Sequence, residues 1–312
     1  MGILRATYVV FIFSKIKYMM KLWVKNNWKY LMVFLICTLI MCYGILEEQN
    51  VFEILKRAFF EPGYKENFFA GTENAKELAN VEPSVINIIK HVLSNAQYTL
   101  DVSIIFGTRW FQILIPLFAI MSGVVFYNSY NTVMNFEFYR KTKYRPTVFG
   151  SVLKNSLKIA VAIFLAYLIF LLFINNIATS GWMGSDERSF FSDILGNRFF
   201  IEHTLLYFVL EGIVRFLLIP FAYATLAQSI VLLGKDLKEV IAAPILYYYG
   251  LSAVGYAASI IVPWLAIYIN PSVIMASGTY DNYSSIILIL VNLIPLFIGL
   301  GIIYWRTRYV EL

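Results

Sequence analysis

The chain has 312 residues, of which 60% are hydrophobic and 14% charged, and its formal net charge is +6. Its basic residues are spread beside long apolar stretches, where they meet anionic lipid headgroups, so this charge does not indicate nucleic-acid binding. The apolar stretches are uninterrupted, which excludes a membrane β-barrel, because barrel strands alternate lipid-facing and lumen-facing residues. The predicted fold class is therefore all-α.

A helix that crosses a bilayer needs roughly 20 predominantly apolar residues, and six stretches of the chain provide such a run. They are Tyr30–Leu46, Trp110–Tyr127, Leu157–Ile174, Leu205–Leu233, Val240–Val262 and Ser284–Trp305. We therefore predict a polytopic membrane protein with six transmembrane helices, forming a single membrane domain over residues 1–312 in the cell membrane.

The charges around these stretches predict the orientation. If both termini are cytoplasmic, the inner segments are 1–29, 128–156, 234–239 and 306–312, and the outer segments are 47–109, 175–204 and 263–283. Counted with Lys158 at the foot of the third stretch, the inner segments hold 16 basic and 4 acidic residues, against 8 basic and 14 acidic outside. Basic loops are retained on the cytoplasmic side, so we expect cytoplasmic N and C termini.

Segment 1–29 is predicted to form an interfacial helix on the cytoplasmic side. Its apolar run Ala6–Phe13 is short and is followed by lysines without a small-residue cleavage site, which does not fit a signal peptide. Aromatic and aliphatic side chains can gather on one side of a helix here, while the lysines reach the lipid phosphates. The first span that follows contains the two cysteines of the chain, Cys37 and Cys42, whose positions point in different directions on a helix and predict free thiols.

Segment 47–109 is too short and too weakly apolar to build a stable core of its own. It contains two predicted helices, Val51–Phe60 and one that begins at Pro83. A lid or spacer is the simpler interpretation, and contact with a substrate is the alternative.

Segment 128–156, between the second and third spans, is strongly basic. Pro146 predicts a helix, a break and a second helix that leads into the membrane. The segment is either a plain juxtamembrane loop or a docking element for a cytoplasmic partner. Its charged residues are Glu137, Arg140, Lys141, Lys143, Arg145 and Lys154.

The fourth span is longer than a membrane requires, so it should tilt or project. It carries Glu211 and Arg215, four residues apart and with the acid first, which is the favourable order for a helical ion pair. An unpaired charge near the bilayer centre costs about 2.5–3.5 kcal/mol, so this intramembrane charge pair should face the protein interior or a wet cavity. It either locks two helices together or takes part in transport or switching.

Segment 263–283, before the last span, begins with an apolar run that is broken by Pro263 and by the pair Asn270-Pro271. A pair of helices that re-enters the membrane or lies at its surface fits this pattern, because irregular backbone at membrane depth needs cover from protein or a wet cavity.

The motifs of common enzyme classes are missing from the sequence. It has no GxxxxGK[ST] phosphate loop, no HExxH and no GxSxG, and its two histidines are His91 and His203. We therefore expect no catalytic site, metal or cofactor in the chain itself. Tyr247, Tyr248 and Tyr249 in the fifth span fit aromatic packing, and one of them is a candidate to line a path.

Taken together, these features resemble the ABC-2 type permease family, the membrane subunit of many bacterial ATP-binding-cassette exporters. The likeness covers the interfacial helix, the six spans, the cytoplasmic ends and the broken segment. The run FEFYRKTKYRPTVFGSVLKNSLK is similar to the family's first cytoplasmic loop, with Lys141 in place of its usual glycine. A second likeness is to the family's P-W…N-P run. The matching residues are Glu137, Thr142, Pro146 and Lys154 in the loop, and Pro263, Trp264, Asn270 and Pro271 in the broken segment.

The resemblance implies a mechanism and partners. Two permease subunits, identical or related, would enclose a path above two cytoplasmic ATPase subunits, which hold the ATP and Mg²⁺. The helix around Glu137–Arg145, including Thr142, would dock on the ATPase, and Lys235 and Lys238 of the next inner loop would add a smaller contact. The cargo classes implied are peptides, antibiotics, lipids and polysaccharides. The alternatives are a secondary transporter or channel, and a membrane scaffold or sensor that transports nothing.

Overall fold

The computed structural model describes residues 27–48, 50–61, 100–131, 144–177, 191–234, 236–275 and 283–311, and within these ranges the regular secondary structure is helical without any β-strand. Six helices are long and apolar enough to cross a membrane, which confirms the all-α class and the six predicted stretches. These helices are Asn27–Glu48, Phe111–Ser129, Tyr144–Asn176, Thr204–Val231, Leu237–Ile261 and Ser285–Arg308. Residues 1–26 of the predicted interfacial helix 1–29 and the helix expected from Pro83 lie outside the described residues, and residues 27–29 belong to the helix Asn27–Glu48.

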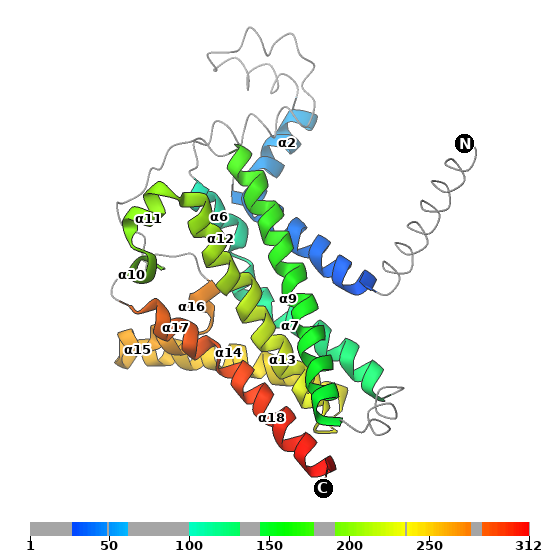
Figure 1. The fold of residues 1–312 in the computed structure, drawn as a ribbon. Coiled ribbons are helices and arrows are strands. Elements are labelled where there is room, and N and C mark those ends of the chain that lie inside the picture. The colour runs from blue at the N-terminus through cyan, green and yellow to red at the C-terminus, as the bar shows by residue number, and fades with distance from the viewer. Residues whose placement is uncertain are drawn as a thin grey trace, which may run out of the picture.

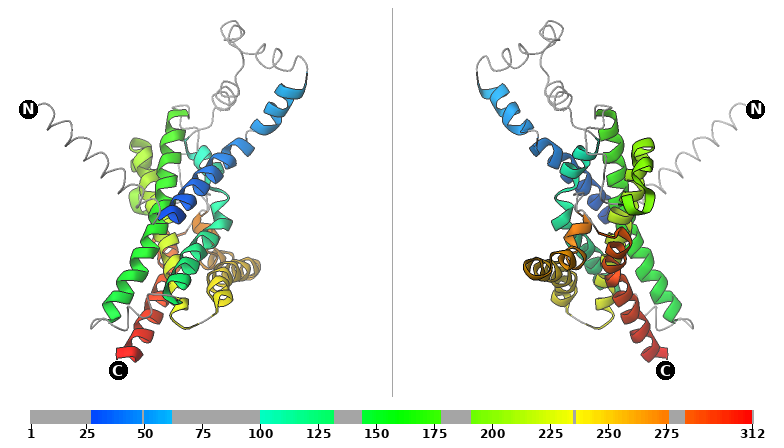
Figure 2. Two further views of the ribbon diagram at one scale, coloured as in Figure 1. Left: turned by 90° about the vertical axis from the view of Figure 1, so that its right-hand side faces the viewer. Right: turned by 90° about the vertical axis from the view of Figure 1, so that its left-hand side faces the viewer.

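The helix α13 (Ile219–Val231) lies at the centre of the bundle. It packs against α7 (Phe111–Ser129), α9 (Tyr144–Ile177), α14 (Leu237–Ile261) and α18 (Ile294–Glu311), and most of its side chains are buried. Figures 1 and 2 show α9, α13 and α18 running along the bundle, while α14 and α15 (Pro263–Ile269) project from its side. The projecting pair exposes large apolar side chains, among them Ile260 at 86% and Trp264 at 64%.

The buried apolar side chains form two clusters. The larger one involves the helix Asn27–Glu48 and the adjoining parts of α7, α9 and α13. The smaller one lies at the end of the bundle that carries the C-terminus, which we call the inner end after its predicted orientation. It comprises Phe126, Tyr144, Val148, Val152, Val231, Leu232, Val240 and Ile303.

Helix α9 is continuous over 34 residues. Pro146 falls in its first turn, where the missing backbone N–H has no intrahelical partner to lose. The second helix of the predicted pair is therefore present, and it continues without a break into the third span. The first helix of that pair falls within residues 132–143, outside the described ranges.

A proline inside α7 is accommodated by tyrosines from another helix. Pro116 has no N–H for the carbonyl of Gln112, four residues earlier, and the Tyr248 hydroxyl of α14 donates a hydrogen bond to that carbonyl instead. The Tyr249 hydroxyl donates to the next carbonyl, that of Ile113, at 2.5 Å. Interhelical hydrogen bonds of this kind satisfy the backbone where no water is available.

We expect Tyr248→Phe to lower the free energy of unfolding by about 0.6–1.7 kcal/mol, the range measured for hydrogen bonds between membrane helices. In a Pro116→Ala background the same change should cost almost nothing, because the restored N–H serves the Gln112 carbonyl. Denaturation of the purified full chain in detergent measures both values. An equal loss in the two backgrounds would show that the hydroxyl does not serve the carbonyl left by the proline.

Segment 47–109, which the charges predict to lie outside, contains helix α2 (Val51–Phe60), as predicted, and a further helix that the sequence did not predict, α6 (Leu100–Thr108). Gly44 of the first span packs so closely on α6 that an added Cβ would lie 2.6 Å from the Phe106 carbonyl oxygen. This close contact requires a residue without a side chain.

Arg109 fastens the chain after α6 to the end of the first span. It binds Glu47 at 2.8 Å and Glu48 at 2.7 Å. Burial alone would lower the pKa of the Arg109 guanidinium, but its hydrogen bonds and charge interactions with both carboxylates outweigh burial and raise that pKa. The guanidinium also offsets two negative charges at a helix C-terminus, where they are otherwise unfavourable.

The last span is divided at Leu293 into α17 (Ser285–Asn292) and α18. Pro295 explains the division, because the residues at and before a proline leave the helical hydrogen-bond pattern easily. The start of α17 is held by α10 (Ser192–Leu195): the Asp193 carboxylate accepts a hydrogen bond from the Ser285 N–H at 2.8 Å. An acid at a helix N-terminus satisfies a free donor there.

Candidate functional site: a buried ion pair at a π-helix

The fourth span widens into a π-helix near its middle. The six residues Ile213–Leu218 form η2, between α12 (Thr204–Gly212) and α13. Pro220 gives a local reason, because it has no N–H to offer the Phe216 carbonyl four residues earlier and so interrupts the regular pattern. Single π-turns within α-helices occur often at functional sites.

Glu211 and Arg215 meet at the beginning of this π-helix. Their side chains form an ion pair of 2.6 Å, and both are 0% exposed. The two charges therefore compensate each other in the protein interior, as their spacing predicts. Removing a single partner from such a pair leaves an uncompensated buried charge.

Arg215 also binds the broken segment. Its Nε donates to the Ile274 carbonyl at 3.1 Å, and its Nη2 donates to the Met275 carbonyl. Both carbonyls belong to the last residues of α16 (Ser272–Met275), where a helix leaves carbonyl groups without intrahelical donors. One guanidinium thus joins two features that the sequence suggested separately, the intramembrane charge pair and the interrupted segment before the last span.

One aromatic side chain of α9, that of Tyr167, packs against the π-helix. The Tyr167 ring stacks on Phe216 at a centroid distance of 4.4 Å, and the Tyr167 hydroxyl donates to the Phe208 carbonyl at 3.0 Å. This arrangement depends on Gly212, because a Cβ there would lie 2.2 Å from Cε1 of Tyr167. These contacts hold α9 against the fourth span on either side of the ion pair.

The broken segment forms a pair of short helices, as predicted. Pro263 begins α15, and Asn270 ends it. The Asn270 Oδ1 then accepts hydrogen bonds from the N–H of Ser272 at 3.0 Å and from its hydroxyl at 2.8 Å, which caps the start of α16. Gly255 of α14 allows the close contact, because a Cβ there would lie 2.7 Å from Cβ of Asn270.

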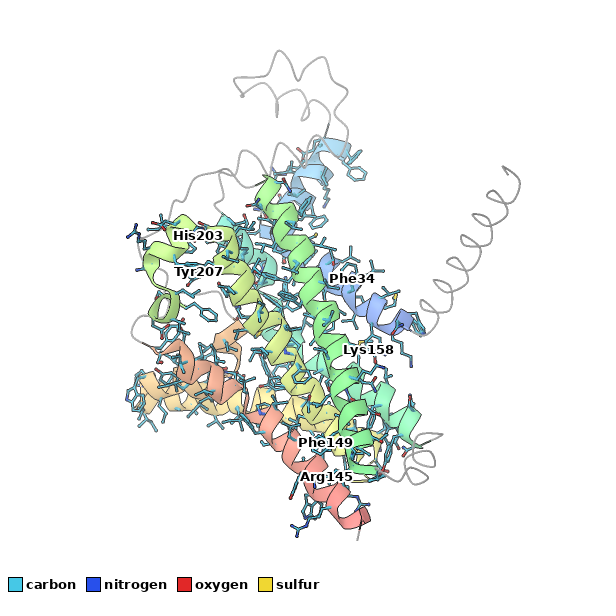
Figure 3. The ribbon with its side chains drawn as sticks, in the orientation of Figure 1. Phe34, Arg145, Phe149, Lys158, His203 and Tyr207 are labelled. Carbon is cyan, nitrogen blue, oxygen red and sulfur yellow. The ribbon has the colours of Figure 1, made fainter. Side chains whose placement is uncertain are left out.

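The predicted docking residues are only partly described. Glu137, Arg140, Lys141, Thr142, Lys143 and Lys235 lie outside the described ranges. Arg145 lies at the inner end, where its guanidinium is 3.9 Å from the ring centroid of Tyr304 on α18 (Figure 3). Lys154 on α9 and Lys238 in the first turn of α14 are exposed. Docking on an ATPase remains a prediction for all of them.

The tyrosines of the fifth span are part of the packing. Tyr248 is 1% exposed, and its ring lies 5.5 Å from that of Tyr223. Tyr247 contacts the same Tyr223 ring at 5.9 Å.

Cys37 is buried, and neither it nor Cys42 forms a disulfide, as their spacing predicts.

The sequence indicates the charges of this site but not its neighbours. Tyr167, Gly212, Ile274 and Met275 carry no recognisable motif, and their roles follow from tertiary contacts alone. Pro220 is the one local signal that could have suggested an irregular turn in the fourth span. Chemically, the site is a buried ion pair whose guanidinium also binds two backbone carbonyls. Comparison of the chain with family models, with curated proteins and with solved structures gives no match.

Proposed function

We propose that this chain is the permease subunit of an ATP-binding-cassette exporter of the ABC-2 type, driven by a separate cytoplasmic ATPase. The observation that carries this proposal is the continuity of α9. It begins at Tyr144, within the basic segment 128–156, and extends through the third span past Tyr167, which packs on the π-helix. A force applied to the basic segment therefore reaches the buried ion pair through one stiff element.

The proposed mechanism follows this path. The ATPase docks on the segment around Glu137–Arg145, with a smaller contact at Lys235 and Lys238, and its closure moves α9 as a rigid body. Tyr167 transmits the motion to η2, and Arg215 transmits it to the carbonyls of α16. Packed cores switch between discrete arrangements instead of deforming continuously, so the ion pair and its two carbonyl partners serve as the element that switches.

In this proposal both termini are cytoplasmic and 263–283 re-enters the membrane or lies at its outer surface. A second permease subunit, identical or related, completes the path, and ATP and Mg²⁺ are bound by the ATPase. The cargo is amphipathic or lipophilic, of the peptide, antibiotic, lipid or polysaccharide class. Apolar side chains on α14 and α15 are suited to a lipid or protein neighbour.

Coexpression with the products of the neighbouring genes, among which the proposal expects a cassette ATPase, tests the proposal. We expect the two chains to copurify, and the double change Glu137→Gln and Arg140→Gln to weaken their association about tenfold, since two surface ion pairs contribute up to about 1–2 kcal/mol. The control is Glu202→Gln with Arg198→Gln, an exposed pair that makes the same two charge changes on the predicted outer side. Equal association of both double variants would contradict the docking role.

Glu211 favours one other function. A buried charged pair within a span, such as Glu211 with Arg215, is the kind of feature that an ion-coupled transporter needs. Proteoliposomes that hold the chain without any ATPase distinguish the two functions. Proton flux that Glu211→Gln abolishes would favour the coupled transporter, whereas cargo movement that requires both ATP and the ATPase favours the permease. An ATPase that binds without moving any cargo would indicate a scaffold.

A further inference from the structure

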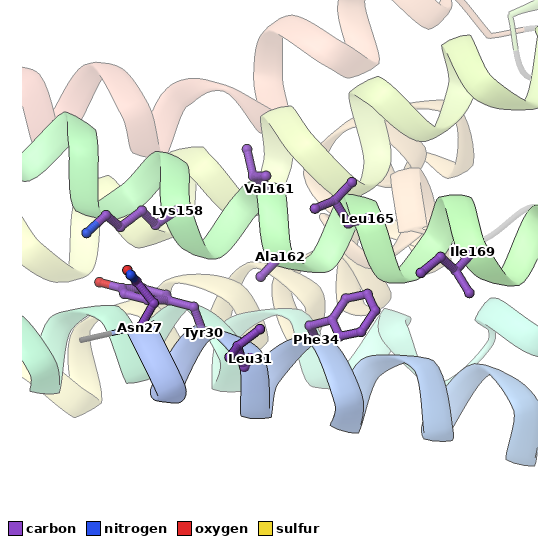
Figure 4. Close-up of a pocket in the computed structure, with 9 residues that line it drawn as sticks. All are labelled: Asn27, Tyr30, Leu31, Phe34, Lys158, Val161, Ala162, Leu165 and Ile169. Atoms are coloured by element: carbon purple, nitrogen blue, oxygen red, sulfur yellow. The ribbon is translucent and has the colours of Figure 1, made fainter. Parts of the chain in front are cut away.

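A groove runs along the surface of the bundle between the helix Asn27–Glu48 and α9. Its volume is about 370 Å³, within the range of small-molecule sites. Its polar lining residues lie at one end (Figure 4): Asn27, Tyr30 and Lys158. The other lining residues are all apolar: Leu31, Phe34, Val161, Ala162, Leu165 and Ile169. The groove is therefore polar at one end only.

The polar end of the groove carries the positive charge of Lys158. The Lys158 ammonium lies 5.4 Å from the ring centroid of Tyr30, and within the described residues no carboxylate pairs with it. Lys154 precedes it by one turn on α9 and so faces the same side. A lysine ammonium is a good ligand for phosphate oxygens.

The same end has the features of a membrane interface. Trp28 is 53% exposed beside Tyr30, and such aromatic residues mark the depth of the lipid headgroups. The apolar wall then extends from Lys158 to Ile169, which is roughly 16 Å along a helix axis. One leaflet of the hydrocarbon core is about 15 Å thick. The groove thus matches a lipid molecule in both polarity and length.

We propose that this groove is a binding site for one anionic phospholipid. Its phosphate binds Lys158, with Lys154 adding charge, and one acyl chain lies between the two helices against Phe34, Ala162 and Leu165. Basic pockets between membrane helices bind acidic headgroups in this way. The site does not depend on the proposed transport function. A free phosphate would leave the apolar wall uncovered, which is why the inference is a lipid.

Native mass spectrometry of the full chain in detergent tests the site, with phosphatidylglycerol and phosphatidylcholine of identical acyl chains as probes. We expect one tightly bound phosphatidylglycerol and weaker binding of phosphatidylcholine. Lys158→Gln should weaken phosphatidylglycerol binding about fivefold, the effect of one lysine near an anionic lipid surface. Lys56→Gln, the same charge change on an exposed residue of α2, is the control.

A second pair of variants tests the acyl chain. Leu165→Trp fills the groove, whereas Leu172→Trp places the same ring on the same helix beyond it, at a position of similar exposure (47% and 56%). Loss of binding in the first variant alone supports the site. Equal binding by wild type and Lys158→Gln, equal binding of the two lipids, or identical behaviour of the two tryptophan variants would each overturn it.

Discussion

Arg215→Ala is expected to be the most destructive single change described for this chain, with a loss of about 3–5 kcal/mol in the free energy of unfolding. The change leaves the Glu211 carboxylate buried without its 2.6 Å partner and removes the donors of two α16 carbonyls. Glu211→Gln should cost less, because the amide oxygen still accepts a hydrogen bond from Arg215, which also keeps its two carbonyl partners.

Thermal unfolding and the folded yield of the purified chain measure this difference. The control is Arg198→Ala, which breaks an exposed pair of the same spacing, with Glu202 at 2.7 Å. Exposed pairs contribute little, so this variant should behave as wild type. If Arg215→Ala is as stable as wild type, the site is hydrated and the buried geometry has no energetic role.

Gly212→Ala is expected to destabilise the chain by about 1–3 kcal/mol, as overpacking of a tight core does. The added Cβ meets the Tyr167 ring at 2.2 Å. That ring cannot easily move away, because it is 0% exposed and its hydroxyl is bound to the Phe208 carbonyl. If the ring shifts, its stacking on Phe216 is lost, so the change should also weaken the connection between α9 and the π-helix.

Gly301→Ala provides the matched control. It is also a helical glycine, but nothing lies within 4 Å of its added Cβ, so alanine should be neutral or gain up to about 1 kcal/mol from helix propensity. Chemical denaturation of both variants gives the comparison. A double variant with Tyr167→Leu should lose less than the sum of the single changes, because leucine makes room for the methyl group. Additive losses would mean that the ring is not the obstacle.

The spans were predictable because their signal is local. Hydropathy located all six, and amphipathic spacing gave α2 with its observed ends, Val51–Phe60. The Glu211–Arg215 pairing was predictable for the same reason, since four residues along a helix bring two side chains together. The identity of the carbonyls that Arg215 also binds, 59 and 60 residues further along the chain, is a tertiary property that no local pattern contains.

Prolines illustrate the limit of sequence reasoning. Pro116, Pro220 and Pro295 are visible in the sequence, yet each lies in an apolar run that hydropathy reads as one helix. The outcomes differ: a continuous helix whose free carbonyl is bound by a tyrosine, a π-helix, and a division of the last span. Which outcome follows depends on the donors that neighbouring helices offer, and those are set by packing.

The hydrogen bonds that Tyr248 and Tyr249 of α14 donate to α7 restrict how these two helices can move relative to each other. Sliding α14 along α7 would leave the Gln112 carbonyl, which has no N–H partner at Pro116, without a donor, and would also break the bond to the Ile113 carbonyl. A rearrangement of the helix bundle that keeps these hydrogen bonds must therefore move α7 and α14 together.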